Sequence, residues 1–257
     1  MPEVADFEAL TGLGVRGNVN GQMVLVGADR LMAQEGVNVD GFLAQATLWG
    51  EDAKTAVFVA IEGQAVALVA VADPIRPEAT RVVTDLRQKG LQLAMITGDG
   101  PHTGKAVARQ LGIETVVAGV MPEGKAEAIA ELQQNSAVAF VGDGINDAPA
   151  LAAAEVGIAV GTGTDVAIET ADVVLMSGDL SGVLRAVEIS KRTMGNIRQN
   201  LFWAFAYNVA LIPVAAGLLF PIWGVLISPI FAGGAMALSS VFVVSNALRL
   251  RRMEVSE

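Results

Sequence analysis

The sequence predicts an α/β protein, in which a parallel sheet with helices on both faces follows a small α+β fragment and precedes a two-helix transmembrane hairpin. Two observations carry this prediction. Between residues 66 and 176, apolar runs of strand length alternate with amphipathic stretches of helical length, as in parallel sheets. The 50 residues from Gln199 to Leu248 then contain no charged side chain and no histidine, enough for two membrane spans of about 20–25 residues each.

The composition narrows the function classes. The net charge is −10, so the chain offers no basic stripe to nucleic-acid phosphates, and we expect no nucleic-acid partner. These 257 residues include no cysteine, which excludes a disulfide framework and a thiolate metal site within them.

The elements follow in order along the chain. Near the N-terminus, Asn20-Gly21 lies between two apolar runs and suits the two-residue turn of a β-hairpin. Strands of the parallel sheet are expected at 66–72, 92–96, 115–118, 138–141, 157–160 and 172–175. Helices are expected at 80–89, 102–111, 123–134 and 148–154.

Two polar clusters follow strands of this predicted sheet. Thr97-Gly98-Asp99-Gly100 comes after the strand that ends at Ile96, and Gly142–Asp147 comes after the strand that ends at Val141. Ligands of parallel sheets bind beyond the carboxyl ends of the strands. Carboxylates suit Mg²⁺, and turn amides with a threonine hydroxyl suit phosphate. Either cluster alone reads as an ordinary turn, whereas the two together predict a magnesium–phosphate site.

Lys125 is a candidate phosphate ligand between these clusters. Pro122 suits the first turn of a helix, which places Lys125 in that turn, where it can point at a phosphate beyond the strands. A solvated surface lysine is the alternative that the sequence leaves open.

At these motifs the sequence resembles the phosphorylation domain of P-type ATPases, a branch of the haloacid dehalogenase-like hydrolases with a Rossmann-like sheet. The resemblance rests on Thr97-Gly98-Asp99, on Pro122–Lys125 and on the highly specific run Gly142–Leu151. The run 73–77, Asp-Pro-Ile-Arg-Pro, is similar to the family's Asp-Pro-Pro-Arg hinge, with Ile75 in place of the second proline. The resemblance covers essentially the whole chain.

The resemblance implies a role for each motif residue. Asp143 would hold Mg²⁺ against the transferred phosphoryl group. Thr97 and Lys125 would bind phosphate oxygens, and Lys125 would also offset developing charge. The remaining motif residues would arrange and support the loops: Gly98, Asp99, Asn146 and Asp147.

The N-terminal residues also resemble the family. Residues 7–15 look like the end of its nucleotide-binding domain, whose Gly-x-Gly, here Gly12 and Gly14, would let the backbone approach ATP closely. A plain hairpin is the alternative, and both can hold together. The implied domains are a remnant of the nucleotide-binding domain (1–65), a phosphorylation domain without its nucleophile-bearing segment (66–180), a cytoplasmic helix (181–200), two transmembrane helices (201–248) and a cytoplasmic tail (249–257).

The apolar region predicts an integral membrane protein in contact with lipid. Its two segments, 201–220 and 222–248, join at Pro221 and Gly224. Basic residues flank both outer ends: Lys191, Arg192 and Arg198, then Arg249, Arg251 and Arg252. This pattern places both termini in the cytoplasm, and the resemblance implies a bacterial plasma membrane. A buried hairpin in a soluble core is the alternative.

The hairpin also indicates the transported ion. Tyr207-Asn208 lies in the first segment, and Met236, Ser239 and Ser240 share one face of the second. Thioether sulfur suits Cu(I). The set resembles the signature of the monovalent-copper pumps, which implies Cu(I) or Ag(I) as cargo, export from the cytoplasm and delivery by a copper chaperone. Close helix packing by these residues is the alternative.

Several family motifs are missing: the nucleophile motif, the His-Pro element, the Thr-Gly-Glu motif and the Cys-Pro-Cys membrane site. The family's nucleophile lies in Asp-Lys-Thr-Gly-Thr, and this sequence has no such run. We therefore expect that the chain alone forms no aspartyl-phosphate and needs the missing N-terminal part of the pump as its partner. A truncated gene, a split gene or a partial sequence would account for this.

Two other functions stay open. One is a noncatalytic, membrane-anchored remnant or split-gene subunit that binds Mg²⁺ or phosphate. The other is a phosphatase of the same superfamily fused to a membrane anchor. His102, the single histidine, is expected at a helix start on the surface rather than as a metal ligand.

Overall fold

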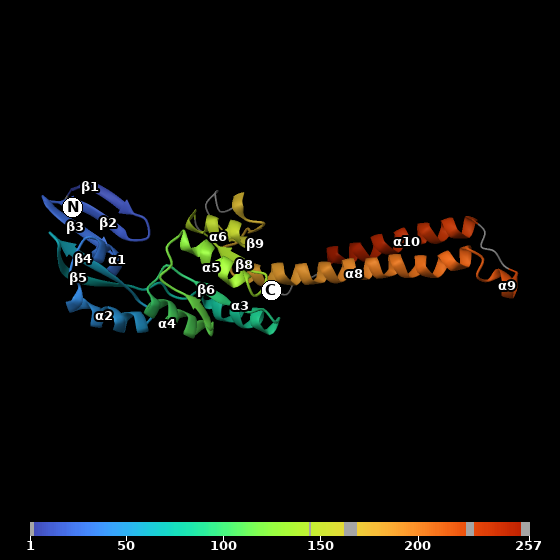
Figure 1. The fold of residues 1–257 in the computed structure, drawn as a ribbon, viewed down its shortest axis with the longest axis horizontal. Helices are drawn as coiled ribbons and strands as arrows, with labels where there is room; N and C mark the ends of the chain where they lie inside the picture. Colours follow the sequence, from blue (N-terminus) through green and yellow to red (C-terminus); the bar gives the residue numbers. More distant parts are fainter. Residues whose placement is uncertain (1–2, 144, 162–168, 225–228, 253–257) are drawn as a thin grey trace. The chain divides into compact units, whose positions relative to one another are not determined.

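The computed structural model describes residues 3–143, 145–161, 169–224 and 229–252. The chain divides into two compact units, Met1–Gly182 and Val183–Glu257. Figure 1 traces the order of the elements along the chain. Each unit is described below by itself.

The first unit opens with a five-stranded antiparallel sheet in the order β1-β2-β3-β4-β5. Its elements are β1 (Val4–Leu10), β2 (Gly14–Val19), β3 (Gln22–Gly27), α1 (Asp29–Gln34), α2 (Asp40–Glu51), β4 (Thr55–Ile61) and β5 (Gln64–Val71). The turn between β2 and β3 has φ of 53° at Asn20 and 84° at Gly21. Two successive positive φ values are those of a type I′ turn, so the predicted hairpin is confirmed.

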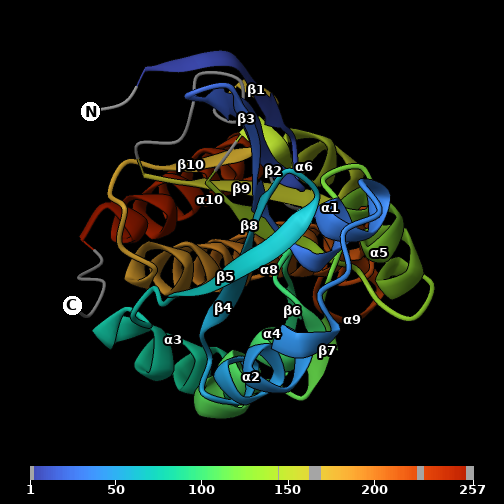
Figure 2. The same ribbon diagram turned by 90° about the vertical axis from the view of Figure 1, so that its left-hand side faces the viewer.

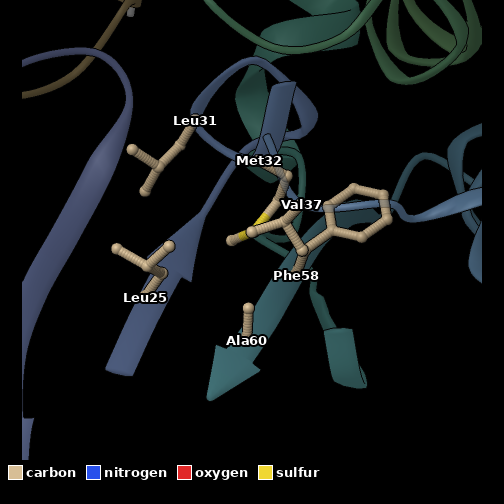
Figure 3. Close-up of a cluster of buried hydrophobic side chains, with 6 residues drawn as sticks. All are labelled: Leu25, Leu31, Met32, Val37, Phe58 and Ala60. Carbon is tan, nitrogen blue, oxygen red and sulfur yellow. The ribbon is translucent and has the colours of Figure 1, made fainter. Parts of the chain in front are cut away.

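Helix α1 packs on this sheet and closes its core. Leu31 and Met32, next to each other in α1, are fully buried. They meet side chains from β3 and β4, as Figure 3 shows. The whole cluster consists of Leu25, Leu31, Met32, Val37, Phe58 and Ala60. Because full burial of one such large side chain contributes about 1.5–3 kcal/mol, this cluster holds α1 in a fixed position against the strands.

The rest of the first unit alternates strands with helices. Its elements are α3 (Pro77–Gln88), β6 (Ala94–Ile96), α4 (Pro101–Leu111), β7 (Thr115–Val117), α5 (Gly124–Gln133), β8 (Ala139–Gly142), η1 (Ile145–Asp147), α6 (Ala148–Ala153), β9 (Val156–Val160) and β10 (Val173–Leu175). All strand pairs in this part are parallel. The predicted α/β class and the four expected helices are therefore confirmed.

The prediction of one continuous parallel sheet is wrong for the described residues. The strands form a two-stranded sheet, β6-β7, and a separate three-stranded sheet, β10-β9-β8. The strand expected at 66–72 belongs to neither, because β5 pairs antiparallel with β4. Its two-residue link to β4, Glu62-Gly63, has positive φ at both positions and makes a tight hairpin, which a strand pattern alone does not reveal.

The second unit consists of helices. They are α8 (Ser181–Ala215), which begins at the end of the first unit, α9 (Phe220–Trp223), α10 (Pro229–Arg249) and η2 (Leu250–Arg252). The predicted cytoplasmic helix and the first apolar segment, as far as Ala215, thus lie in one helix of 35 residues. Within the described ranges, neither α8 nor α10 nor any other helix combines the length and apolar content that a membrane crossing requires.

Amide side chains join α8 to α10, which lie side by side in Figure 1. Asn196 Nδ2 donates to the carbonyl of Asn246 at 2.8 Å, and Asn246 Nδ2 donates to Asn200 Oδ1 at 2.8 Å. Asn200 Nδ2 in turn donates to Asn196 Oδ1 at 3.1 Å. These three residues form an amide ladder that fixes the register of the two helices.

Candidate phosphate-binding site

The Thr97-Gly98-Asp99 loop leaves the carboxyl end of β6 and folds back on itself. The Thr97 hydroxyl donates to Asp99 Oδ2 at 2.9 Å and accepts from the Asp99 amide at 3.1 Å. The segment after β7 holds this loop, because the Gly119 amide donates to the Asp99 carbonyl at 2.7 Å and the Val120 amide to the Thr97 carbonyl at 3.1 Å. The loop is therefore an ordered turn with a hydroxyl and a carboxylate at the end of a parallel strand.

Lys125 joins the second cluster. It lies in the first turn of α5, as expected, and its Nζ is 2.6 Å from Asp147 Oδ1. The side chains are 18% and 12% exposed. Asp147 Oδ2 also accepts from the Asp143 amide at 3.3 Å. The alternative of a solvated surface lysine is therefore wrong, and Lys125 lies with two carboxylate residues at the end of β8.

Gly142, the last residue of β8, allows this arrangement. A Cβ at Gly142 would lie 2.8 Å from Asp147 Cβ and 2.9 Å from Asp147 Oδ2. Any side chain here would push Asp147 away from Lys125 and from the Asp143 amide. The glycine that opens the motif thus serves close packing beneath the loop.

Asp143 suits a magnesium ion. Mg²⁺ is usually bound in proteins by one or two carboxylates together with phosphate oxygens and water. Asp143 and Asn146 are both exposed just beyond β8, so their side chains are open to a ligand. Gly144 between them lies outside the described residues. Among the residues that are described, no three acidic or histidine side chains cluster into a cation site. An ion bound by Asp143 would therefore take most of its remaining ligands from phosphate oxygens and water.

Gly12 and Gly14 have packing reasons of their own. Gly14 has φ of 149°, and a Cβ there would lie 2.3 Å from the Val26 carbonyl oxygen and 2.5 Å from Gly27 Cα. A Cβ at Gly12 would lie 2.9 Å from Met121 Cε. Gly14 is thus required by close backbone packing, whereas Gly12 is favoured by its φ of 71°, and the role of both toward a nucleotide stays a prediction.

Two residues that the sequence did not single out contact the Thr97-Gly98-Asp99 loop. Thr55 Oγ1, at the start of β4, donates to Asp99 Oδ1 at 2.9 Å. Arg30, in α1, donates to the carbonyl oxygens of Gly119 at 2.9 Å and Gly98 at 3.4 Å. Neither lies in a motif, and only the three-dimensional packing of the antiparallel sheet beside this loop reveals them.

The predicted ion-site residues lie on two helices of the second unit. On α8, Tyr207 is half-buried, and the exposed Asn208 donates to its own helix at the Ala204 carbonyl, at 2.7 Å. On α10, Ser239 is half-buried and Ser240 is exposed. The side chain of Met236 lies outside the described part of the chain. The role of these five residues as ion ligands stays a prediction.

Comparison with known proteins places the chain in a family. Residues 2–155 match the sequence profile of the haloacid dehalogenase-like hydrolases. The chain belongs to this family. The parallel strands β6, β7 and β8 and the loops at the ends of β6 and β8 lie within that match, whereas β9 and β10 follow it.

Transport ATPases of the family are similar over nearly the whole chain. It is 61% identical to the copper-transporting ATPase 2 of Rhizobium meliloti over 96% of its length, and 48% identical to the silver exporting P-type ATPase of Salmonella typhimurium over its full length. The crystal structure of a zinc-transporting PIB-type ATPase in the E2.Pi state superposes with a TM-score of 0.68 at 35% identity, over 98% of this chain and 40% of that one. The resemblance to copper-class P-type ATPases is thereby confirmed. The chain spans 30% of the Rhizobium meliloti protein and 31% of the Salmonella typhimurium protein.

Proposed function

We propose that this chain belongs to an ATP-driven Cu(I) pump, with Ag(I) as a chemically similar cargo. Residues 1–182, called the headpiece below, contribute its phosphate-binding site, and the second unit contributes part of its ion path. The observation that carries the proposal is the Lys125–Asp147 ion pair beside Asp143 at the end of β8. An ammonium group and the carboxylate of Asp147 meet there, directly beside Asp143, in a chain of this family, and these charges suit phosphoryl transfer.

Each polar group has a task in this reaction. Mg²⁺, when bound with ATP, neutralises charge on the phosphate oxygens. Asp143 would hold that ion, and Lys125 would attract the phosphoryl oxygens while Asp147 keeps the Lys125 ammonium group aimed at the site. Thr97 donates its hydroxyl to a phosphate oxygen. The chain itself contributes positioning and charge, and no nucleophile.

The nucleophile belongs to the missing N-terminal part of the pump. Within the described residues, β6 pairs only with β7 and β8 only with β9, so each has one edge without a partner. A parallel strand inserted between them would join the two sheets into one, and an aspartate at its carboxyl end would reach both clusters. Such a strand, carrying the Asp-Lys-Thr-Gly-Thr motif, completes the site in this proposal.

The second unit supplies two membrane helices in this proposal. The uncharged run Gln199–Leu248 and the basic residues at both of its ends support two spans with both termini in the cytoplasm. The protein is then integral to a bacterial plasma membrane and surrounded by lipid. Met236 provides a soft ligand for Cu(I), and the polar set Tyr207, Asn208, Ser239 and Ser240 completes the path. Transport is export, with copper delivered by a cytoplasmic chaperone.

The other functions that the sequence left open are not favoured. Similarity to transport ATPases across 96% to 100% of the chain supports a segment of a pump over an anchored phosphatase.

A chimera tests the phosphate site. The chain replaces the corresponding segment of the Rhizobium meliloti protein to which it is 61% identical. We expect the chimera to form an acid-stable phosphoenzyme from radiolabelled ATP and Mg²⁺, and the isolated chain to form none. Asp143→Asn should abolish labelling, whereas Asp52→Asn, at an exposed residue after α2, should not. Labelling of the isolated chain, or full labelling of Asp143→Asn, would contradict the proposal.

The same chimera tests the ion site. Cu(I) is expected to stimulate its ATPase activity, and Met236→Leu should remove that stimulation because leucine keeps the volume and loses the sulfur. Met194→Leu is the matched control, since Met194 is an exposed methionine of α8 outside the proposed path. If Cu(I) stimulates the unmutated chimera, Met236→Leu and Met194→Leu equally, Met236 is excluded as a ligand.

A further inference from the structure

The antiparallel sheet reaches into the Thr97-Gly98-Asp99 loop through Thr55. The Asp99 carboxylate accepts two hydroxyl hydrogen bonds, one on each oxygen: Thr55 donates to Oδ1 at 2.9 Å and Thr97 donates to Oδ2 at 2.9 Å. Hydrogen bonds to an ionised carboxylate are stronger than those between neutral groups. Asp99 is therefore held by two hydroxyl donors, and one of them, Thr55, belongs to the antiparallel sheet.

Arg30 makes a second link between the same parts. Its Nη1 donates to the Gly119 carbonyl at 2.9 Å, and its Nη2 lies 3.4 Å from the carbonyl oxygens of both Gly12 and Gly98. The guanidinium group thus bridges the first β-turn of the chain, the Thr97 loop and the segment after β7. The guanidinium group presents five donors in a rigid planar fork, and the three donors of the compact lysine ammonium do not reproduce that geometry.

A packed interface supports these polar contacts. Helix α2 lies against α4, and both views show the two helices as neighbours (Figures 1 and 2). Gly50 of α2 is buried against His102, where a Cβ would lie 2.7 Å from that of the histidine. The buried Thr103 donates its hydroxyl to the Lys54 carbonyl, next to Thr55, at 3.0 Å. The start of β4 is therefore fixed relative to α4, and Thr55 has little freedom to leave Asp99.

We infer that Thr55 and Arg30 are positioning residues for the Thr97-Gly98-Asp99 loop, so that the antiparallel sheet sets the geometry of the phosphate-binding loop. The importance of this loop for phosphate rests on the proposed function. The positioning itself is a property of the fold.

The number of hydroxyl hydrogens in the loop gives Thr55 a specific role. The Thr97 hydroxyl has one hydrogen, which it now gives to Asp99. To donate that hydrogen to a phosphate oxygen, Thr97 must release Asp99. Thr55 then remains as the side-chain donor that keeps the Asp99 carboxylate, and the backbone of the loop, in place.

Hydrogen–deuterium exchange of the purified 257-residue chain tests the inference. The amides of Gly119 and Val120 report on the loop, because they donate to the carbonyls of Asp99 and Thr97. We expect Thr55→Val and Arg30→Lys to raise their exchange rates at least about fivefold, the effect of losing one net hydrogen bond. Thr55→Ser, which keeps the hydroxyl, should restore the wild-type rates.

Controls separate local positioning from general loosening. Thr84→Val removes a hydroxyl that bonds only the Thr80 carbonyl of its own helix, and should leave the loop unchanged. Exchange across β3 and β4 should stay at wild-type rates if the variants remain folded. Wild-type rates at Gly119 and Val120 in both Thr55→Val and Arg30→Lys would overturn the inference.

The chimera then relates positioning to catalysis. Thr55→Val should lower the rate of phosphoenzyme formation about tenfold and leave the KM for ATP within twofold, since Thr55 acts through Asp99 and not on the nucleotide. An unchanged rate would overturn the link to catalysis. If the unmutated chimera forms no phosphoenzyme while the exchange result holds, the proposed function fails and the positioning role stands.

Discussion

At the scale of single residues, the site depends on Gly142, whose lack of a side chain leaves space for the carboxylate of Asp147. Gly142 has no side chain, so Asp147 can fold beneath the end of β8 and bind both Lys125 and the Asp143 amide. The result is an ion pair that is largely shielded from solvent. Such a pair is sensitive to the loss of one partner, because the other charge is then left without compensation.

Lys125→Met should therefore destabilise the protein. Removal of the ammonium group leaves Asp147 as a poorly solvated carboxylate, which costs about 3 kcal/mol in the free energy of unfolding. Chemical denaturation of the purified chain measures this change. Lys105→Met, at an exposed lysine of α4, is the matched control and should stay within about 0.5 kcal/mol of the wild type. Equal stability of the two variants would show that the Lys125–Asp147 pair contributes nothing.

Glu155 provides a pH-dependent contribution. Its Oε2 accepts from the Val138 amide at 2.7 Å and from Gln133 Nε2 at 2.8 Å, and these bonds, the amide first, hold the pKa of the Glu155 carboxyl below its ordinary value. A lowered folded-state pKa stabilises the protein above the unfolded value of about 4.3, and this stabilisation is lost as the pH falls through the folded value. Glu155→Gln should thus be less stable than wild type at pH 7, and the difference should shrink in acid. Denaturant titrations of both proteins at pH 7 and at a pH below the ordinary pKa of glutamate check this. An equal difference in the free energy of unfolding at the two pH values would contradict it.

At the scale of elements, a helix beside the antiparallel sheet packs closely on a helix of the parallel α/β region, because a glycine lies at the contact. Helix α2 brings Gly50 against the first turn of α4, where His102 and Thr103 lie. His102 is an exposed residue at a helix start, as the sequence predicted. The contact fixes the antiparallel sheet beside the Thr97 loop.

Gly50→Ala should open this contact. The new Cβ would lie 2.7 Å from His102 Cβ, so α2 or α4 must shift, and overpacking of this kind costs about 1–3 kcal/mol. Gly41→Ala, in the same helix with open space around it, should be neutral or slightly stabilising. Thermal unfolding compares the two variants. A Gly50→Ala protein as stable as Gly41→Ala would mean that the two helices do not pack closely in solution.

The sequence predicted much of the element order and of the site, and the misses have physical causes. Local patterns sufficed for the Asn20-Gly21 turn, the helices after each strand and the loops of Thr97 and Asp143. They failed for β5, since a strand pattern does not say which partner the strand finds. They also missed Arg30 and Thr55, because hydrogen bonds across 44 or more residues leave no local signature.

At the scale of the whole molecule, the parallel strands form two sheets where a single sheet was expected. Strands β6 and β7 make one, and β8, β9 and β10 make the other. The Thr97 loop follows the first sheet and the Asp143 loop the second, so the two halves of the phosphate site belong to different sheets. The segment from Val117 to Lys125 connects them, since it hydrogen-bonds the Thr97 loop at one end and carries Lys125 at the other.

Within the part of the chain that the structure describes, β6 and β8 each have an edge without a partner strand, which matters for expression of this chain. Bare backbone donors and acceptors on a strand edge are templates for pairing with another molecule, and apolar strands beside them favour aggregation. We expect the isolated headpiece, residues 1–182, to self-associate with rising concentration in analytical ultracentrifugation. A synthetic peptide with the sequence of the strand that precedes Asp-Lys-Thr-Gly-Thr in a P-type ATPase carrying that motif should keep it monomeric, and a scrambled peptide should not. A headpiece that stays monomeric alone would mean that these edges are protected, and the chain would then be far easier to handle than its strand pairing suggests.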